Sequence, residues 1–300
     1  MNAAPETGYG QHVAIIGLGL IGGSIARGLR VAGGAASIVG CVATTEDAKR
    51  AVELGIVDEA TTDLGKAVAG ADLVVVAVPV GAMADVFADL ARAMPAAAVI
   101  TDVGSVKMAV ITAAREQLGA RIGRFVPGHP IAGTEHSGLE AGFGALYEDR
   151  RVILTPTPET DRDAFAAVEA LWRALGARVT EMDAAHHDEV LAATSHLPHV
   201  LAFALVDTLA RMAERTEIFE YAAGGFADFT RIASSDPALW SDIVSANRDA
   251  VLPVLDRYIG DLEALRGAIA GRDGAMLTSA FGRAKQARDR FASQYIQDQG

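Results

Sequence analysis

The sequence predicts an α/β fold, with a mostly parallel sheet that carries helices on both faces and an all-α domain after it. Three observations support this prediction. An apolar strand-like run near the N-terminus leads through a glycine-rich turn into a helix-like segment. Strand-like and helix-like segments then alternate as far as residue 183, which is typical of parallel strands joined by helices. Between residues 184 and 300, no segment has the pattern of a strand.

Short runs of apolar, often β-branched residues define the expected strands, which are residues 13–16, 37–42, 73–78, 99–102, 125–128, 151–155 and 178–181. Among the helices expected between them are residues 24–30, 46–54, 107–118 and 162–175. The expected helices of the second half are residues 184–213, 237–259 and 261–294. Pro198 lies inside the first of these. Because proline lacks a backbone N–H and crowds the carbonyl of Thr194, we expect a kink or break there.

The turn after the first strand has the pattern of a dinucleotide-binding site. Gly17, Gly19 and Gly22 form a G-x-G-x-x-G motif between the strand and the helix. The first glycine permits a tight turn, the second lets the backbone approach a pyrophosphate, and the third lets the helix pack closely on the strand. The helix N-terminus offers free N–H groups to the phosphates. We therefore predict an N-terminal Rossmann-type domain.

Composition and charge exclude several other classes of protein. The net charge is −12, so we expect no nucleic-acid partner. The single cysteine, Cys41, excludes an intrachain disulfide and suits a reducing cytoplasm. No stretch offers about 18 uninterrupted apolar residues, and glycines break the apolar run near the N-terminus. We therefore expect a cytoplasmic protein without a membrane segment.

These patterns predict three parts. We expect a flexible leader at residues 1–10, a dinucleotide-binding domain at residues 11–183, and a helical substrate and dimerisation domain at residues 184–300. Helices of the last part carry apolar residues on more than one face, as in residues 200–206. Because such helices need burial on both sides, we predict that this domain forms a homodimer.

Two reactive residues follow expected strands, at the edge where a parallel sheet binds its ligands. His129 lies between a glycine and a proline, so its backbone is restrained. A neutral imidazole held there suits the acceptance of a proton from a substrate hydroxyl, although a histidine that only stabilises the turn is the alternative. Ser105 is a candidate partner for the same hydroxyl, and its alternative is a helix N-cap.

The helical half adds a second group of candidates. His196 and His199 are three residues apart and so share one helix face. Arg231 suits a substrate carboxylate, which it would bind through two parallel hydrogen bonds; the alternative is a surface arginine. Clustered histidines also raise the alternative of a metal site. However, H-x-x-H beside a proline is poor zinc geometry, and no H-E-x-x-H motif accompanies it, so we expect no metal.

Taken together, these segments resemble the prephenate/arogenate dehydrogenases of tyrosine biosynthesis, in that family's order and over residues 12–250. The segments that carry the resemblance are residues 17–22, 101–107, GHPIAGTE at 128–135, HD at 187–188, SHLPH at 195–199 and DFTRIA at 228–233. The resemblance implies oxidative decarboxylation of prephenate or arogenate with NAD or NADP, in a homodimer joined through its helical domains. It implies that His129 is the catalytic base and that Ser105 helps to hold the substrate hydroxyl. The residues that it implies at the substrate are Arg231, His199, His196, Thr134, Glu135, Asp228 and Trp240.

The cofactor remains either NAD or NADP, and the substrate either prephenate or arogenate. The residues that we expect at the cofactor are Gly17, Gly19, Leu20, Ile21, Gly22, Thr44, Thr45, Val78, Pro79 and Asp102. An acidic residue that binds the ribose of NAD usually ends the second strand, but Val42 occupies this place. Lys49 and Arg50 come a helical turn later, so a basic clamp for a 2′-phosphate is missing at the strand end, and we favour NAD.

Two other functions fit the glycine-rich turn. A two-domain dehydrogenase of the β-hydroxyacid type needs a catalytic lysine on the first long helix of its helical domain, and residues 184–213 contain none. A non-catalytic dinucleotide-binding sensor would not need His129, Ser105 and Arg231 together. If the base is a histidine with an ordinary pKa, kcat/KM falls below a pH of about 6.5.

Overall fold

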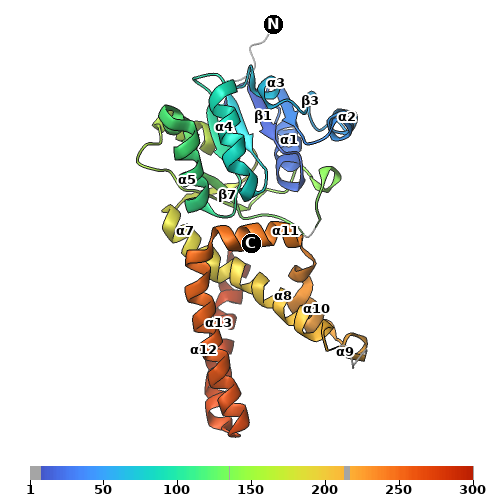
Figure 1. Cartoon of the computed structure of the whole chain (residues 1–300), viewed down its shortest axis with the longest axis vertical. Helices are drawn as coiled ribbons and strands as arrows, with labels where there is room; N and C mark the ends of the chain where they lie inside the picture. Colours follow the sequence, from blue (N-terminus) through green and yellow to red (C-terminus); the bar gives the residue numbers. More distant parts are fainter. Residues whose placement is uncertain (1–7, 135, 213–216, 300) are drawn as a thin grey trace. The chain divides into compact units, whose positions relative to one another are not determined.

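The computed structural model describes residues 8–134, 136–212 and 217–299 (Figure 1). The chain divides into two compact units, Met1–Arg248 and Asp249–Gly300. Most of the expected leader, residues 1–10, lies outside the described residues. The first unit contains both sheets and every described residue that we expected at the cofactor or the substrate.

Six parallel strands form the main sheet in the order β3-β2-β1-β4-β5-β6. The strands are β1 (His12–Ile16), β2 (Ser37–Cys41), β3 (Glu59–Thr61), β4 (Leu73–Val76), β5 (Val99–Asp102) and β6 (Phe125–Val126). The chain runs outward from β1 to β3 and then returns to β4 on the other side of β1. Because a parallel sheet binds ligands at the carboxyl ends of its strands where the order reverses, this topology predicts a ligand site beside the ends of β1 and β4.

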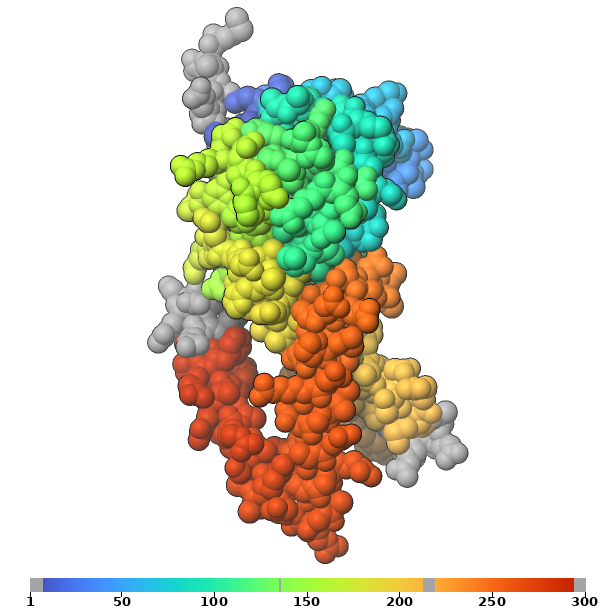
Figure 2. All heavy atoms as spheres, turned by 60° about the vertical axis from the view of Figure 1, so that its left-hand side comes forward, coloured from blue at the N-terminus to red at the C-terminus, as the bar shows by residue number. Residues whose placement is uncertain are grey.

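Helices cover both faces of this sheet. They are α1 (Leu20–Ala32), α2 (Thr45–Glu53), α3 (Leu64–Val68), α4 (Met83–Ala93), α5 (Lys107–Leu118) and α6 (Arg162–Ala174). Val13 and Ile15 of β1 belong to the core cluster that includes α1 and α6. Ala14 and Ile16 belong to the cluster that includes α3, α4 and α5. Alternate residues of one strand thus serve two cores, and α4 and α5, in teal and green, cover the second face side by side (Figure 2).

A smaller sheet carries β7 (Gly128–Pro130), β8 (Arg151–Leu154) and β9 (Arg178–Glu181), with β7 antiparallel to β8 and β8 parallel to β9. The single strand expected at residues 125–128 was therefore wrong. Pro127 stands between β6 and β7 and has no N–H for a ladder, so the chain leaves the first sheet there and enters the second. The sequence patterns also missed β3, α3 and α4.

The helical part of the first unit consists of α7 (Ala184–Leu191), a π-helical turn (Ala192–His196), α8 (Leu197–Ala210), α9 (Glu217–Glu220), α10 (Gly224–Thr230) and α11 (Pro237–Ala246). No strand follows Glu181 within the residues that the structure describes. We expected a kink or break near Pro198; the helix is not broken there, but a π-helical turn ends two residues before this proline. A missing N–H at Pro198 is accommodated by this local widening of the helix.

One stretch of the described residues, Ala184–Ala210, has the length and mean hydropathy of a membrane-crossing helix. Our sequence criterion missed it because polar residues, among them Ser195, His196 and His199, interrupt its apolar residues. Only 28% of its most apolar window is buried inside the chain. The buried residues of α8 are Leu197 and Ala202 alone. An apolar helix that its own chain covers so sparsely needs another apolar surface.

The second unit consists of α12 (Arg248–Ala270), which begins at the unit boundary, and α13 (Gly274–Gln299). We expected a break near residue 260, but the helix continues to Ala270. The chain turns only at residues 271–273, where Arg272 has a left-handed φ of 53°. Several large apolar side chains of this unit are at least 43% exposed, namely Leu252, Ile259, Leu262, Ile269, Phe281 and Phe291.

Candidate active site

The glycine-rich turn between β1 and α1 has the geometry of a pyrophosphate site. Gly17 has a φ of 95°, and a Cβ at Gly22 would lie 1.9 Å from the carbonyl oxygen of Gly17. The fold therefore requires both glycines. At Gly19, by contrast, an added Cβ would meet no atom within 4 Å, and no side chain caps the N-terminus of α1. The protein leaves this space and these N–H groups open, which fits a dinucleotide phosphate.

Other residues expected at the cofactor follow the neighbouring strands on the same edge. Thr44 and Thr45, both exposed, begin α2 after β2, and Val78 and Pro79 follow β4. The Thr44 hydroxyl caps α2 by accepting a hydrogen bond from the Asp47 N–H. Leu20 and Ile21 lie half-buried in the first turn of α1. The structure thus brings these residues to the carboxyl ends of three adjacent strands.

Three side chains form a hydrogen-bonded chain at the start of the small sheet. His129 of β7 contacts His187 of α7, with Nδ1 2.8 Å from Nε2. His187 contacts Asp188, with Nδ1 2.8 Å from the carboxylate Oδ1. His187 and Asp188 are buried, whereas His129 is partly exposed. Only the outermost ring of this chain can therefore meet a ligand.

The direction of this chain follows from the carboxylate at its end. An ionised Asp188 only accepts hydrogen bonds, so Nδ1 of His187 donates and Nε2 of His187 accepts. Nδ1 of His129 must then donate to His187. This leaves Nε2 of His129 without a proton in the neutral ring, and a lone pair on that nitrogen is what a base requires.

Electrostatics keep His129 neutral. Burial lowers its pKa well below 6.5, and electrostatic interactions with His187, Lys107 and His196 lower it further. We expected the acid limb of activity near the ordinary histidine pKa of about 6.5. The lowered pKa of His129 instead predicts a limb at lower pH, because the imidazolium form is disfavoured in this enclosed place.

Asp188 also fixes the loop that carries Ser105. Its two carboxylate oxygens accept hydrogen bonds from the backbone N–H groups of Lys107 (2.7 Å) and Met108 (2.8 Å). The carboxylate therefore caps α5 from another helix. The N-cap of α5 is Val106, which excludes the helix-cap alternative for Ser105. Ser105 stays half-buried in the loop between β5 and α5.

Asp102, which we expected at the cofactor, lies entirely inside the protein. One oxygen of its carboxylate is 2.5 Å from Nζ of Lys107, which is also fully buried. The same carboxylate accepts hydrogen bonds from the N–H groups of Gly104 (2.7 Å) and Gly128 (3.2 Å). The Asp102 carboxylate is thus fully used in contacts within the protein. A cofactor would therefore contact the loop after β5 and not this carboxylate.

His196 and Asn247 extend the network away from Asp188. The amide nitrogen of Asn247 lies 2.9 Å from the Asp188 carbonyl oxygen and 3.0 Å from Nδ1 of His196. Because the amide donates, Nδ1 of His196 accepts and its Nε2 carries the proton. That Nε2 is buried and has no hydrogen-bond partner in the structure. Burial lowers the pKa of His196 to about 4, so this ring is a neutral donor.

Trp240 joins the two histidines of the SHLPH segment. Its ring stacks on His199, with centroids 3.4 Å apart and planes 15° apart. It also meets the edge of His196 at 6.2 Å. Nδ1 of His199 donates to the Ser195 carbonyl (2.9 Å), which leaves its Nε2 as an acceptor. Burial lowers the pKa of His199, and the nearby positive charge of Arg231 lowers it further.

Two of the described residues expected at the substrate are not joined to this network. Thr134 and Asp228 are exposed, and no hydrogen bond between described residues connects either to the histidines. Glu135 lies outside the described residues. Among the described residues, the structure therefore brings His129, His196, His199, Trp240 and Arg231 close together, but not Thr134 or Asp228.

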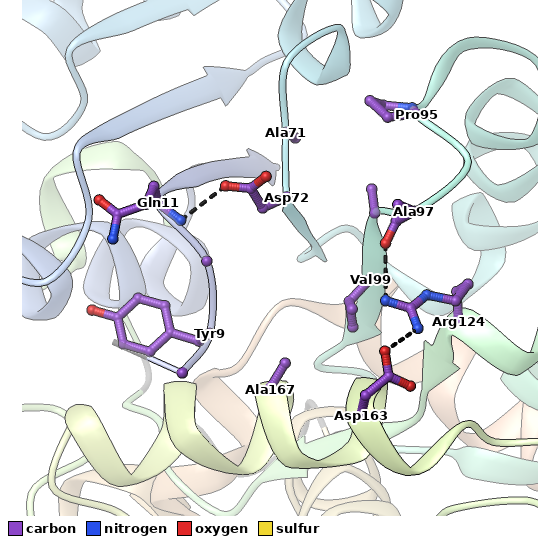
Figure 3. A pocket seen from close by; sticks show the side chains of 13 residues that line it. Tyr9, Gln11, Ala71, Asp72, Pro95, Ala97, Val99, Arg124, Asp163 and Ala167 are labelled. Atoms are coloured by element: carbon purple, nitrogen blue, oxygen red, sulfur yellow. Dashed lines mark hydrogen bonds and ion pairs between the residues drawn. The ribbon is translucent and has the colours of Figure 1, made fainter. Parts of the chain in front are cut away.

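The opposite edge of the sheet holds a separate cavity of about 440 Å³ (Figure 3). It lies at the amino ends of the strands, where Arg124 contacts Asp163 and the Ala97 carbonyl. Asp72 accepts hydrogen bonds there from the N–H groups of Gln11 and His12. None of the residues expected at the cofactor or the substrate lines this cavity.

Sequence reasoning missed the roles of Lys107 and Asn247. Both are buried polar residues whose partners are distant in sequence, so spacing did not reveal them. Composition offered a weak signal, because the chain has only four lysines and only two asparagines, Asn2 and Asn247. Lys107 also begins a helix whose next four residues, 108–111, are all apolar, and this position was a signal of burial.

Comparisons with known proteins agree with this geometry. Residues 25–181 match the family model described as prephenate dehydrogenase, nucleotide-binding domain, and residues 183–283 match its dimerization domain. A cyclohexadienyl dehydrogenase from Zymomonas mobilis is 45% identical over 282 residues, which cover 93% of this chain and 95% of that protein. The structure of a prephenate dehydrogenase from A. aeolicus, in complex with hydroxyphenyl propionate and NAD+, is similar with a TM-score of 0.87 at 38% identity, covering 94% of this chain and 98% of that one. An arogenate dehydrogenase from Synechocystis gives a TM-score of 0.76 at 28% identity, covering 94% and 100%.

Proposed function

Because this chain belongs to the prephenate dehydrogenase family, we propose that it catalyses the NAD(P)-dependent oxidative decarboxylation of prephenate, arogenate or both, in tyrosine biosynthesis. The observation that carries this proposal is the chain from Asp188 through His187 to His129, which presents an unprotonated Nε2. A base of this kind is what the removal of a ring hydroxyl proton needs. The β-hydroxyacid alternative is not favoured, because the chain belongs to a different family.

His129 accepts the proton of the substrate hydroxyl on Nε2. The ring is then positively charged, and its Nδ1–H still donates to His187. Asp188, at the far end, stabilises that charge through the intervening ring, as the acid does in a catalytic triad. When bound, the nicotinamide would accept the hydride that leaves the substrate ring carbon bearing this hydroxyl. Loss of the ring carboxylate as carbon dioxide makes the ring aromatic and drives the reaction.

Arg231 provides the positive charge that a dianionic substrate needs in a chain of net charge −12. We assign it to a substrate carboxylate, beside His199 and Trp240. His196 offers a donor at Nε2 and His199 offers an acceptor at Nε2. We assign both to the polar groups of the substrate, with Ser105 at its hydroxyl and Thr134, Glu135 and Asp228 at the rim.

We favour NAD over NADP. The acidic residues Glu46 and Asp47 lie in the first turn of α2, close to where a 2′-phosphate would lie. Arg50, the arginine of the same helix, forms an ion pair with Glu140, with a guanidinium nitrogen 2.7 Å from Oε1. A 2′-phosphate would meet these carboxylates and would have to compete for that arginine. The ribose hydroxyl of NAD carries no such charge.

We propose that two copies assemble through their helical parts, with a domain boundary near residue 183. The support is the match to a dimerization domain, the apolar side chains of α8 that are only half-buried, and the exposed apolar side chains of α12 and α13. Exposed patches of this kind mark an interface. Light scattering at micromolar concentration should give the mass of a dimer, and a monomer would contradict this assembly. We infer a cytoplasmic location, which suits the single free thiol of Cys41.

One assay tests the proposed function. Purified protein is mixed with prephenate or arogenate and with NAD or NADP, and the absorbance of the reduced nicotinamide is followed. Turnover in any of the four mixtures supports the function, and the pattern assigns substrate and cofactor. Binding of the dinucleotide without turnover in any of the four mixtures would contradict the proposal and favour a non-catalytic dinucleotide-binding sensor.

A further inference from the structure

A buried ion pair lies next to the general base. Asp102, the last residue of β5, and Lys107, the first residue of α5, have no exposed surface, and their charged atoms are 2.5 Å apart. Burying two charges is costly, and an apolar pair of the same size is often as stable. Stability alone is therefore a weak reason for this pair.

The pair holds both polar groups of one residue, Gly128. Nζ of Lys107 donates to the Gly128 carbonyl oxygen at 2.6 Å, and the Gly128 N–H donates to the Asp102 carboxylate at 3.2 Å. That carbonyl belongs to the peptide bond between Gly128 and His129. The ion pair thus links the end of β5 in the large sheet to the start of β7 in the small sheet, where the base is carried.

Lys107 also fixes the partner of the base. Its backbone N–H donates to Asp188 at 2.7 Å, and Asp188 holds His187. Lys107 therefore contacts a neighbour of each ring in the His129–His187 hydrogen bond: Gly128 through its side chain, and Asp188 through its backbone. A small displacement of Lys107 would change the length of that bond.

We propose that Asp102 and Lys107 are positioning residues for the oxidation, because they hold the peptide before His129 in register with the helix that carries His187. The groups that face His129 are His187 and Asp188 of α7, His196 of the π-helical turn, Lys107 of α5 and Asp102 beneath it. Among these, the ammonium of Lys107 also helps to keep the His129 pKa low. The inference rests on the proposed function, because it concerns the base of that reaction.

Two neutral double variants separate position from charge. Asp102→Asn with Lys107→Gln removes both charges but keeps a donor for the Gly128 carbonyl. Asp102→Asn with Lys107→Met removes the donor as well. We expect the Met variant to lose about tenfold in kcat relative to the Gln variant. In both variants, the pKa of His129 should rise, because the Lys107 ammonium that lowers it is gone, whereas the Asp102 carboxylate is not among the groups that shift it.

The readouts are kcat, the acid limb of kcat/KM, and the titration of the His129 ring followed by NMR. Lys66→Met, at a side chain that is 79% exposed, is the matched control and should change none of them. If neither double variant folds, Asp102→Asn alone lets the lysine become neutral in place and gives the same NMR test. Folded variants with wild-type kcat and an unchanged His129 titration would overturn the proposal. Absence of turnover by the wild-type protein would instead refute the proposed function, and the NMR titration would still decide this one.

Discussion

The cofactor half and the substrate half of the candidate site use different chemical groups. The cofactor half is made of backbone, with Gly17, Gly19 and Gly22 at an uncapped helix N-terminus. The substrate half is made of side chains that are largely buried and joined by hydrogen bonds, among them His187, Asp188 and Asn247. The first half offers a shape and partial charges, whereas the second controls protonation.

This difference predicts how each half fails. A change in the backbone half should weaken dinucleotide binding and leave the chemical step alone. A change in the side-chain half should slow the chemical step and leave dinucleotide binding alone. A variant that changes both dinucleotide binding and the rate of the chemical step would contradict this division of the site.

Replacement of the base should give the largest effect. His129→Asn removes the proton acceptor, and we expect kcat to fall by about 10²-fold or more, with NAD affinity unchanged. Steady-state kinetics and a binding titration measure the two quantities. His186→Asn, at an exposed histidine of α7, is the control. An unchanged kcat in His129→Asn would remove this residue from catalysis.

The next effect should come from the partner of the base. His187→Leu leaves the Nδ1–H of His129 without an acceptor, and we expect kcat to fall by roughly 10- to 100-fold. His187→Gln keeps an acceptor oxygen in place and should recover part of this loss. Equal kcat values for the two variants would show that the hydrogen bond does not orient His129.

Two glycine substitutions sharpen the cofactor side. In Gly19→Ala the new methyl group meets no protein atom, so we expect wild-type thermal stability but about tenfold weaker NAD binding. In Gly22→Ala it meets the Gly17 carbonyl at 1.9 Å, so we expect loss of stability. Calorimetry and a binding titration distinguish the two. Unchanged NAD affinity in Gly19→Ala would mean that the pyrophosphate lies elsewhere.

The smallest effect concerns stability in acid. The pKa of His196 is lowered to about 4, whereas in the unfolded chain it is about 6.5. Above pH 6.5 both states are neutral and nothing changes. As the pH falls from about 6.5 toward 4, only the unfolded chain gains protons, so the free energy of unfolding decreases, by on the order of 1–3 kcal/mol.

His196→Gln should reduce this decrease between pH 7 and pH 5, as measured by urea unfolding, while His186→Gln should not. An identical pH dependence in His196→Gln and the wild-type protein would show that this ring is not held neutral.

Much of the fold follows from local sequence. The apolar runs of β1, β4 and β5 and the glycine-rich turn have their meaning within a few residues of one another, and these elements were predicted. The division of residues 125–128 between two sheets was not predicted. It depends on Pro127, which lacks the N–H needed for pairing with a neighbouring strand. The end of α12 was misplaced although it has a local stop signal, the glycine-containing turn at residues 271–274, where Arg272 has a left-handed φ.

The site was predictable where one residue carries the chemistry, and less so where several share it. His129 stands out between Gly128 and Pro130, and the resemblance assigned it a role. The cap of α5 by Asp188 joins residues about 80 positions apart, and no spacing rule reaches that far. The roles of Lys107 and Asn247 likewise appear only when distant segments meet.

The central claim is that Asp188 and His187 leave His129 neutral with its proton on Nδ1. Long-range nitrogen–proton NMR spectra of histidine-labelled protein at pH 7 test this directly, with His129→Asn used to assign the signals. We expect the His129 ring to show a protonated Nδ1 and an unprotonated Nε2. A doubly protonated ring, or one that carries its proton on Nε2, would contradict the account, because neither has a lone pair where the substrate hydroxyl must be deprotonated.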